Sequence, residues 1–293
     1  MKVDINELRK VRGIGDKTLK RIKENFREDD YLCEYDPSLH LDRNSINLGD
    51  CLELMNGIED KSVDMILADL PYGTTACSWD SIIDLDKLWQ QYERVIKDNR
   101  AIVLTASQPF TNTLISSNKR LYRYNWVWEK EQGVNFLLAK KQPLKIHEDV
   151  VVFYKEQPTY NPQMTEGKPY ISGKGSSGEV TGNVVKMQTV NEGTRYPTTR
   201  LKFNRETGLH PTQKPVKLFK YLIKTYTNEG DLVLDNTAGV ATTAIASITT
   251  NRDYICIEKE EEYYKKGKRW TSLVKSGMDY KEALKKVKKE FGK

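Results

Sequence analysis

One short apolar run, residues 65–68, constrains the fold of this chain most strongly. The run reads Met-Ile-Leu-Ala, is too short for a helix and is followed by a turn at Pro71, so the sequence predicts a strand buried on both faces. This strand is expected to end on Asp69. Open α/β sheets bind their ligands just beyond the carboxyl ends of such strands, so we expect the functional site there.

The residues after this strand combine a carboxylate, a stiff turn and an aromatic ring. Asp69 offers an acceptor, Pro71 restricts the turn and Tyr72 offers an aromatic face. A planar base with an amino group fits this set, because its N–H groups can donate to Asp69 and to the Leu70 carbonyl while its ring stacks on Tyr72. An ordinary strand and turn could carry the same four residues, so a cofactor site elsewhere in the chain is needed.

The four residues Asp69-Leu70-Pro71-Tyr72 resemble the signature Asp/Asn/Ser-Pro-Pro-Tyr/Phe of the DNA amino-methyltransferases. These enzymes transfer a methyl group from S-adenosylmethionine to an exocyclic nitrogen of DNA. Leu70 replaces the first proline, which makes the turn less stiff but keeps the backbone carbonyl. The resemblance implies that Asp69, Leu70, Pro71 and Tyr72 are the catalytic residues.

A second motif lies near the carboxyl end of the chain. A strand over residues 232–234 is expected to end on Asp235, followed by a turn of mostly small residues around Gly239, where a ligand can approach the backbone. The next strand, over 253–257, is expected to end on Glu258. An acidic residue about 20 residues after such a turn is placed to hold a ribose through its hydroxyl groups, in this or in another nucleotide-binding enzyme.

The order of the two motifs resembles the β group of amino-methyltransferases, in which circular permutation places the catalytic motif first. The resemblance spans residues 45–265 and includes His-Pro-Thr-Gln-Lys-Pro at 210–215, which opens a helix expected to end near Tyr226. It implies an α/β, Rossmann-like fold with a mostly parallel sheet and helices on both faces. Ala241 stands where the family's turn has a second glycine, and its methyl group is expected to crowd the cofactor.

The resemblance also implies which residues hold the cofactor. Asp50, after a short strand over 45–48, is expected to contact its adenine or to cap a helix, and Lys214 to lie near its methionine end. The whole implied set is Asp50, Lys214, Asp235, Asn236, Thr237, Gly239 and Glu258.

Residues 5–27 predict two short helices joined by Gly13-Ile14-Gly15. The pattern resembles the helix-hairpin-helix module, which holds nucleic-acid backbone through amides at a helix start. The residues implied in DNA binding are Gly13, Gly15, Lys17 and Arg21. The alternative is a small helical hairpin that packs on the main domain.

Charge and composition favour a nucleic-acid partner. The net charge is +6, with basic excess over residues 8–27 and 259–293, although single charge runs are often solvated helix faces. No apolar run is long enough to span a membrane and no signal peptide is visible, so a cytoplasmic location is expected. Four cysteines and three histidines show no metal-ligand spacing, so no metal is expected. The absence of a Pro-Cys dipeptide argues against a cytosine-C5 methyltransferase.

The expected domains follow from these motifs. They are a helix-hairpin-helix-like extension (1–30), a linker (31–44), a catalytic half (45–156), a target-recognition insert rich in proline and glycine (157–209), and a cofactor half with a basic C-terminal helix (210–293). The predicted function is methylation of adenine N6 in DNA, as in restriction-modification systems, by a chain that could form a homodimer. The alternatives are N4-cytosine methylation and an inactive DNA-binding protein on the same fold.

Overall fold

The computed structural model describes residues 33–75, 77, 80–173, 175, 176, 185, 186, 188–206 and 208–292. The chain divides into two units, Met1–Glu34 and Tyr35–Lys293. Gly13, Gly15, Lys17 and Arg21, predicted to bind DNA, lie outside the described residues.

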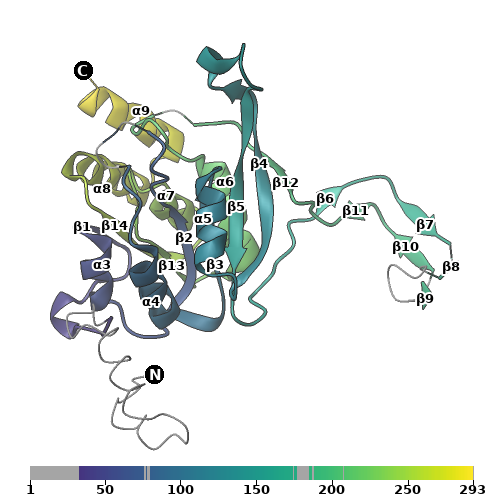
Figure 1. Cartoon of the computed structure of the whole chain (residues 1–293), viewed down its shortest axis with the longest axis horizontal. Helices are drawn as coiled ribbons and strands as arrows, with labels where there is room; N and C mark the ends of the chain where they lie inside the picture. Colours follow the sequence, from purple (N-terminus) through teal and green to yellow (C-terminus); the bar gives the residue numbers. More distant parts are fainter. Residues whose placement is uncertain are drawn as a thin grey trace, which may run out of the picture. The chain divides into compact units, whose positions relative to one another are not determined.

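The second unit is built around an eight-stranded sheet in the order β1-β14-β13-β2-β3-β5-β4-β12 (Figure 1). β5 runs antiparallel to both neighbours, and every other pairing in this sheet is parallel. The mostly parallel α/β sheet expected from the sequence is therefore confirmed. Its strands are β1 (Ser45–Leu48), β2 (Val63–Asp69), β3 (Ile96–Ala106), β4 (Tyr122–Val134), β5 (Lys145–Phe153), β12 (Arg200–Lys202), β13 (Leu232–Asp235) and β14 (Asp253–Glu258).

The predicted strands β2 and β13 are neighbours, although their sequences are far apart. Val233 pairs with Met65 and Leu234 with Ile66 in a parallel register. Because carboxyl ends of parallel strands meet at one edge of a sheet, Asp69 and Asp235 come to the same edge.

Helices cover both faces of the sheet, because successive side chains of the buried strand β2 point to opposite faces and both sets are apolar. Two groups of helices, defined below, cover the two faces. Ile66 and Ala68 pack in an apolar cluster with the first group, and Met65 and Leu67 pack in another cluster with the second group. The first group is α3 (Cys51–Leu54), α4 (Leu85–Val95) and α5 (Phe110–Ser117), and short 3-10 turns lie at η1 (Pro37–Leu39), η2 (Met55–Gly57) and η3 (Phe136–Leu138). The second group is α6 (Val216–Tyr226), α7 (Thr242–Ile248), α8 (Glu261–Lys275) and α9 (Tyr280–Phe291).

The expected insert, residues 157–209, contains more regular structure than a loop. Three short antiparallel pairs lead away from the main sheet (Figure 1): β6 (Thr165–Glu166) with β11 (Thr194–Arg195), β7 (Tyr170–Ser172) with β10 (Thr189–Asn191), and β8 (Gly175–Ser176) with β9 (Val185–Lys186). β12 then returns to the main sheet, where Leu201 pairs with Trp128 of β4. The end of this segment therefore belongs to the main sheet.

β3 begins directly after α4 and starts with polar residues. α4 ends at Val95 and β3 begins at Ile96. The first residues of β3 include Lys97 and Arg100, which donate to the buried Asp64 of β2 at 2.7 and 3.0 Å. These ion pairs stabilise charged residues within a strand. The pattern of apolar residues in the sequence does not predict such positions.

None of the helices among the described residues is long and apolar enough to cross a membrane. Nor do those residues include a group of three or more histidine, cysteine or acidic side chains that could hold a metal ion. Cys51 and Cys256 are buried thiols, and Cys77 is an exposed one.

Asp64 is predicted to be a major determinant of stability, because it also accepts from the amide of Leu232 on β13 at 3.0 Å. Removing one partner of a buried ion pair costs about 3–5 kcal/mol. Asp64→Ala should lower the free energy of unfolding by about 3 kcal/mol in denaturant titrations at neutral pH. Asp98, which pairs with Lys61 and Lys155 at the surface, is the matched control, and Asp98→Ala should change stability little.

The pH dependence tests the same interaction. Burial alone would raise the pKa of Asp64, but bonds from Leu232, Lys97 and Arg100 lower it below 3.8. A lowered pKa gives stability that is present above the unfolded value and lost as the pH falls through the folded one. The difference between the parent and Asp64→Ala should therefore shrink in acid. A difference that stays constant down to about pH 3 would contradict this role.

Candidate functional site

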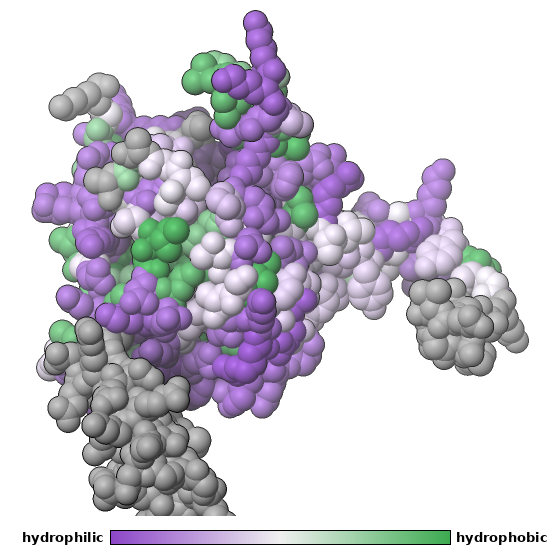
Figure 2. Space-filling model, in the orientation of Figure 1, coloured by the Kyte–Doolittle hydropathy of each residue, from purple (hydrophilic) through white to green (hydrophobic). Residues whose placement is uncertain are grey.

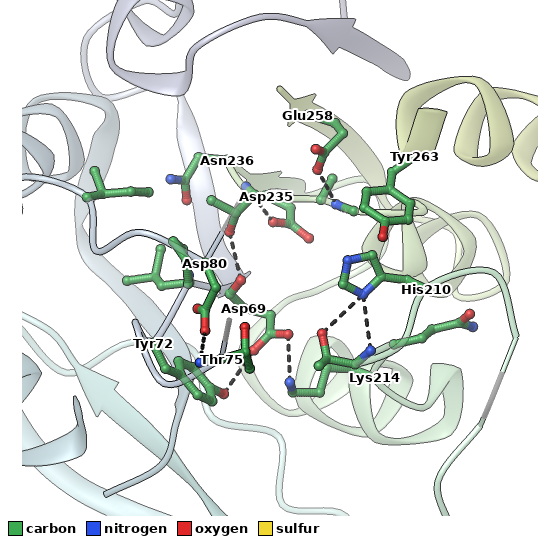
Figure 3. Close-up of a pocket in the computed structure, with 18 of the residues that line it drawn as sticks. Asp69, Tyr72, Thr75, Asp80, His210, Lys214, Asp235, Asn236, Glu258 and Tyr263 are labelled. Carbon is green, nitrogen blue, oxygen red and sulfur yellow. Dashed lines mark hydrogen bonds and ion pairs between the residues drawn. The ribbon is translucent and has the colours of Figure 1, made fainter. Parts of the chain in front are cut away.

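A cavity of about 660 Å³ opens at the carboxyl edge of the sheet (Figure 3). It is lined by all the described residues that the sequence predicted for catalysis or cofactor binding: Asp50, Asp69, Leu70, Pro71, Tyr72, Lys214, Asp235, Asn236, Thr237, Gly239 and Glu258. The structure thus brings the two distant motifs into one cavity.

A direct hydrogen bond joins the two motifs. The Thr237 hydroxyl, in the turn after β13, donates to the backbone carbonyl of Asp69 at 3.0 Å. Thr237 is one of the residues expected to hold the cofactor, so this bond connects the expected cofactor motif with the end of β2.

The Asp69 carboxylate is held by three donors. Its Oδ1 accepts from the hydroxyl groups of Tyr72, at 2.9 Å, and of Thr105 on β3. Its Oδ2 accepts from the Lys214 ammonium at 2.6 Å. Tyr72, Thr105 and Lys214 come from three separate segments, so the orientation of Asp69 depends on the fold around it.

Tyr72 lines the cavity, and one face of its ring is covered by Phe110. The ring stacks on Phe110 of α5 with centroids 5.4 Å apart and planes 21° apart. Burial and the negative charges of Asp69 and Glu148 raise the pKa of Tyr72, so its hydroxyl remains a donor. Because Phe110 covers one face, a stacked ligand can use only the other.

Glu148 and Lys130 complete a charged group that the sequence analysis did not assign. Lys214 lies 3.4 Å from Glu148 Oε2, and Lys130 donates to Glu148 Oε1. Burial alone would raise the pKa of Glu148, but the ammonium groups of Lys214 and Lys130 lower it to about 2. Asp69 and Glu148 thus balance two buried ammonium groups. The sequence offered one indication of this group, because Lys130 and Glu148 lie within the strands β4 and β5, and a charge in a buried strand needs a partner of opposite charge.

Lys214 contacts the residues of the expected catalytic motif. Its ammonium contacts Asp69 and Glu148 and lies 5.4 Å from the Tyr72 ring centroid, and its place near the methionine end of a cofactor stays a prediction. Burial would lower the pKa of Lys214, but the two carboxylates raise it, so the side chain remains charged.

Asp80 organises the loop after Tyr72 and was also missed. Its carboxylate accepts from the amides of Gly73, Thr74 and Thr75 at 2.9, 2.9 and 2.6 Å. Three successive amides around one carboxylate fix the path of the chain at the cavity wall. An aspartate in a loop gives no sequence signal for this role, because its partners are all backbone groups.

The turn after β13 is shaped by two buried acids. Asp235 accepts from the Thr237 amide at 3.1 Å and from the Thr243 hydroxyl, and burial raises the pKa of Asp235 to about 7. Glu258 accepts from the amides of Gly239 and Glu260 at 2.6 and 2.7 Å. Gly239 has a φ of +53°, and an added Cβ there would meet no atom within 4 Å, so this backbone faces open space.

Asn236 and Asp50 also line the cavity. The Asn236 side chain accepts from the Tyr92 hydroxyl at 2.6 Å. Asp50 caps α3 by accepting from the Leu52 amide at 2.9 Å, and its other oxygen lies 3.3 Å from the Lys259 ammonium. The capping alternative for Asp50 is thus observed, while its position in the cavity wall leaves the cofactor role open to test.

Ala241 does not line the cavity, contrary to expectation. Its backbone is left-handed, with a φ of +63°, and its side chain is fully buried. The methyl group points toward α8, where it lies within 3.1 Å of the position that a Cβ on Gly267 would occupy. Gly267 therefore makes room for the methyl group that was expected to crowd the cofactor.

Comparison with known proteins shows the family. Residues 63–269, more than half of the chain, match the DNA methylase family of N6 and N4 enzymes. The chain belongs to this family. This confirms the DNA methyltransferase activity expected from the sequence.

Curated relatives agree with this assignment. The chain is 26% identical to the type II methyltransferase M2.MboI of Moraxella bovis, over 80% of this chain and 90% of that protein. It is 29% identical to the DNA adenine methyltransferase YhdJ of Escherichia coli, over 75% of this chain and 80% of that protein.

Solved structures share the fold. The complex of M1.HpyAVI with S-adenosylmethionine superposes with a TM-score of 0.54 and 23% identity, covering 76% of this chain and 98% of that one. The cytosine-N4-specific PvuII DNA methyltransferase superposes with a TM-score of 0.60 and 14% identity, covering 86% and 93%.

The raised pKa of Asp235 predicts a particular pH dependence of stability. A carboxyl group with a folded pKa of about 7 and an unfolded value of 3.8 favours folding in its neutral form, and this contribution is lost as the pH rises through 7. Asp235→Asn keeps an acceptor for the Thr237 amide and cannot ionise. The variant should therefore be more stable than the parent at about pH 8 and gain less at about pH 5, in chemical denaturation without cofactor. An equal difference at both pH values would contradict the prediction.

Proposed function

We propose that this DNA methyltransferase transfers the methyl group of S-adenosylmethionine to N6 of adenine. The observation that carries the proposal is the contact between the two motifs, in which Thr237 bonds to Asp69 at the floor of one cavity. A base held at Asp69 and a cofactor held at the Gly239 turn would therefore be neighbours.

The cofactor side of the cavity has suitable chemistry. Asp235 offers a carboxylate for the methionine ammonium, and Glu258 offers acceptors for ribose hydroxyl groups. Asp50 is positioned to contact the adenine ring, as the family resemblance implies. The open space at Gly239 lets a ligand lie against the turn. These roles are consistent with residues that line one continuous cavity.

The target adenine would be flipped out of the duplex and stacked on the open face of Tyr72. Its amino group donates to Asp69 and to the Leu70 carbonyl, which favours a pyramidal nitrogen with an available electron pair. Bound S-adenosylmethionine supplies an electrophilic methyl carbon. Asp69 is fixed by Tyr72 and Thr105 and needs little reorganisation, so positioning and electrostatics provide most of the rate.

The Lys214 ammonium donates to Asp69 Oδ2, and the amino group of the target would donate to the same carboxylate. A carboxylate oxygen accepts more than one hydrogen bond, so both donors fit on Asp69. Glu148 lies 3.4 Å from the same ammonium and offers it a second anchor. Lys214 would thus keep the carboxylate paired before the base binds, which limits the cost of a buried charge.

Asp69 favours adenine over cytosine, because family members that act on cytosine tend to have serine at this position. The curated relative YhdJ is named a DNA adenine methyltransferase, whereas the PvuII enzyme that shares the fold is named cytosine-N4-specific. Mass spectrometry of nucleosides from DNA treated with the purified protein distinguishes the two products. N6-methyladenine is expected, and N4-methylcytosine alone would refute the adenine assignment.

The alternative of an inactive protein depends on two residues that depart from the family pattern, Leu70 and Ala241. Leu70 is 3% exposed and packs in the apolar core, so burial replaces the stiffness of the missing proline. Ala241 packs toward α8, away from the cavity wall. Neither departure from the family pattern obstructs the site.

Asp69→Ala is predicted to abolish methyl transfer, because the amino group loses its carboxylate acceptor. Loss of a single electrostatic donor or acceptor at a reacting centre commonly costs about 100- to 1,000-fold in rate. Tritium transfer from labelled S-adenosylmethionine measures the rate, and calorimetry measures cofactor binding. Binding should persist, because the cofactor side of the cavity is intact. Retained activity would refute the assignment of Asp69.

The N-terminal segment is proposed to hold DNA backbone as a helix-hairpin-helix module. Lys17→Glu combined with Arg21→Glu should weaken DNA binding and reduce the salt dependence of log K by about 2, since each phosphate contact contributes about 0.9. Fluorescence anisotropy over a salt series measures this slope. Lys119→Glu with Arg123→Glu, two exposed residues outside both basic segments, changes the net charge equally and is the control. An unchanged slope in the Lys17 and Arg21 variant would favour a packing role for the segment.

A further inference from the structure

The turn between β4 and β5 carries an exposed apolar cluster that the site does not use. We call residues 135–146 the hairpin tip. Phe136 is 76% exposed and Leu137 is 83% exposed, more than any other described large apolar residue. Leu138, Leu144 and Ile146 are also exposed, and Figure 2 shows apolar side chains gathered at the outer end of this hairpin.

The hairpin tip is ordered by its own backbone. The Leu138 amide donates to the Asn135 carbonyl at 2.9 Å, the Ala139 amide to Phe136 at 3.1 Å, and the Lys141 amide to Leu138 at 2.8 Å. Asn135 has a φ of +67°, a left-handed conformation that asparagine tolerates better than most residues. The apolar side chains are therefore presented on a turn of defined shape.

The base of the hairpin tip forms part of the cavity wall. Val134, Asn135 and Lys145 line the cavity, and the Lys145 ammonium donates to the Ser107 hydroxyl at the end of β3. Phe136 and Leu137 therefore follow directly in the chain from the cavity rim. Anything that these two side chains contact lies next to the entrance of the site.

The charge around the apolar cluster fits a polyanion. Residues 132–147 contain Lys140, Lys141 and Lys145 and no acidic residue, and both Lys140 and Lys141 are exposed. Two copies of this chain packed tip to tip would bring like charges together, which disfavours self-association through this surface. An apolar projection surrounded by lysines suits insertion between base pairs with the lysines on phosphates, because proteins that kink DNA insert phenylalanine or leucine in this way.

We propose that the hairpin tip inserts Phe136 and Leu137 into the DNA duplex beside the target adenine and stabilises the flipped state. The inference rests on the proposed function, since it requires a base to leave the duplex for the cavity. The side chains would fill the space that the base leaves, while Lys140 and Lys141 contact the flanking phosphates. The wedge lowers the cost of unpairing and takes no part in methyl transfer itself.

The test separates flipping from chemistry. Sequencing of methylated positions in DNA from cells that express the protein identifies a target site. Two duplexes of that site are then compared, one with the target adenine paired to thymine and one with it opposite an abasic position, where flipping costs less. Single-turnover methyl transfer is measured for the parent and for Phe136→Ala combined with Leu137→Ala.

The single-turnover rate of the double variant should fall about tenfold or more on the paired duplex and stay within about threefold of the parent rate on the abasic duplex. This corresponds to a difference of roughly 1 kcal/mol or more in the free energy of unpairing. Phe136→Leu combined with Leu137→Met, which keeps an apolar wedge, should retain the parent rate on both. Leu39→Ala combined with Phe291→Ala removes exposed apolar side chains outside the cavity wall and is the control.

Other outcomes would overturn the inference. An equal loss of rate on both duplexes would show that the hairpin tip acts in DNA binding or in methyl transfer and not in flipping. An unchanged rate on both duplexes would show that the hairpin tip has no role in the reaction. A change of oligomeric state in size-exclusion chromatography, together with equal losses, would identify the surface as an interface between copies. Absence of methyl transfer by the parent would instead refute the proposed function.

Discussion

The parallel pairing of β2 with β13 is the constraint on which the rest of this structure depends. It brings the ends of two strands, more than 160 residues apart in the chain, to adjacent positions at one edge of the sheet. The Thr237 hydroxyl then fixes the distance between the two motifs through the Asp69 carbonyl. Neither motif forms the cavity alone, because residues of both line its wall.

The carboxyl groups buried at this edge of the sheet are costly to ionise, and the fold offsets this cost in two ways. Asp69 and Glu148 are paired with two ammonium groups, whereas Asp235 has only hydrogen bonds and therefore has a raised pKa. Unpaired charge in an apolar interior is costly, so the site contains either matched pairs or a group that can become neutral. One part of the cavity wall therefore carries Asp235, held by hydrogen bonds, and another part carries the ion pairs of Asp69 and Glu148.

Much of the fold and the two motifs that line the cavity could be predicted from the sequence. Runs such as 65–68 and 232–234 are apolar throughout, which is the pattern of strands buried on both faces, and the acids that end them mark the carboxyl edge. Glu148, Lys130 and Asp80 were not predicted, because their roles come from partners distant in the chain or from backbone amides. The methyl group of Ala241 was placed wrongly for the same reason, since its neighbour Gly267 lies on a helix that no local pattern connects to the turn.

The reversed direction of β5 has a wider consequence. In an all-parallel sheet every connection must cross back over a face, but β4 and β5 form a hairpin, so their turn lies at the same edge as the strand ends Asp69 and Asp235. A turn of this kind can vary in length and composition while the ladder beneath it stays paired. One antiparallel strand thus gives the enzyme a segment beside its site that evolution can reshape independently of the core.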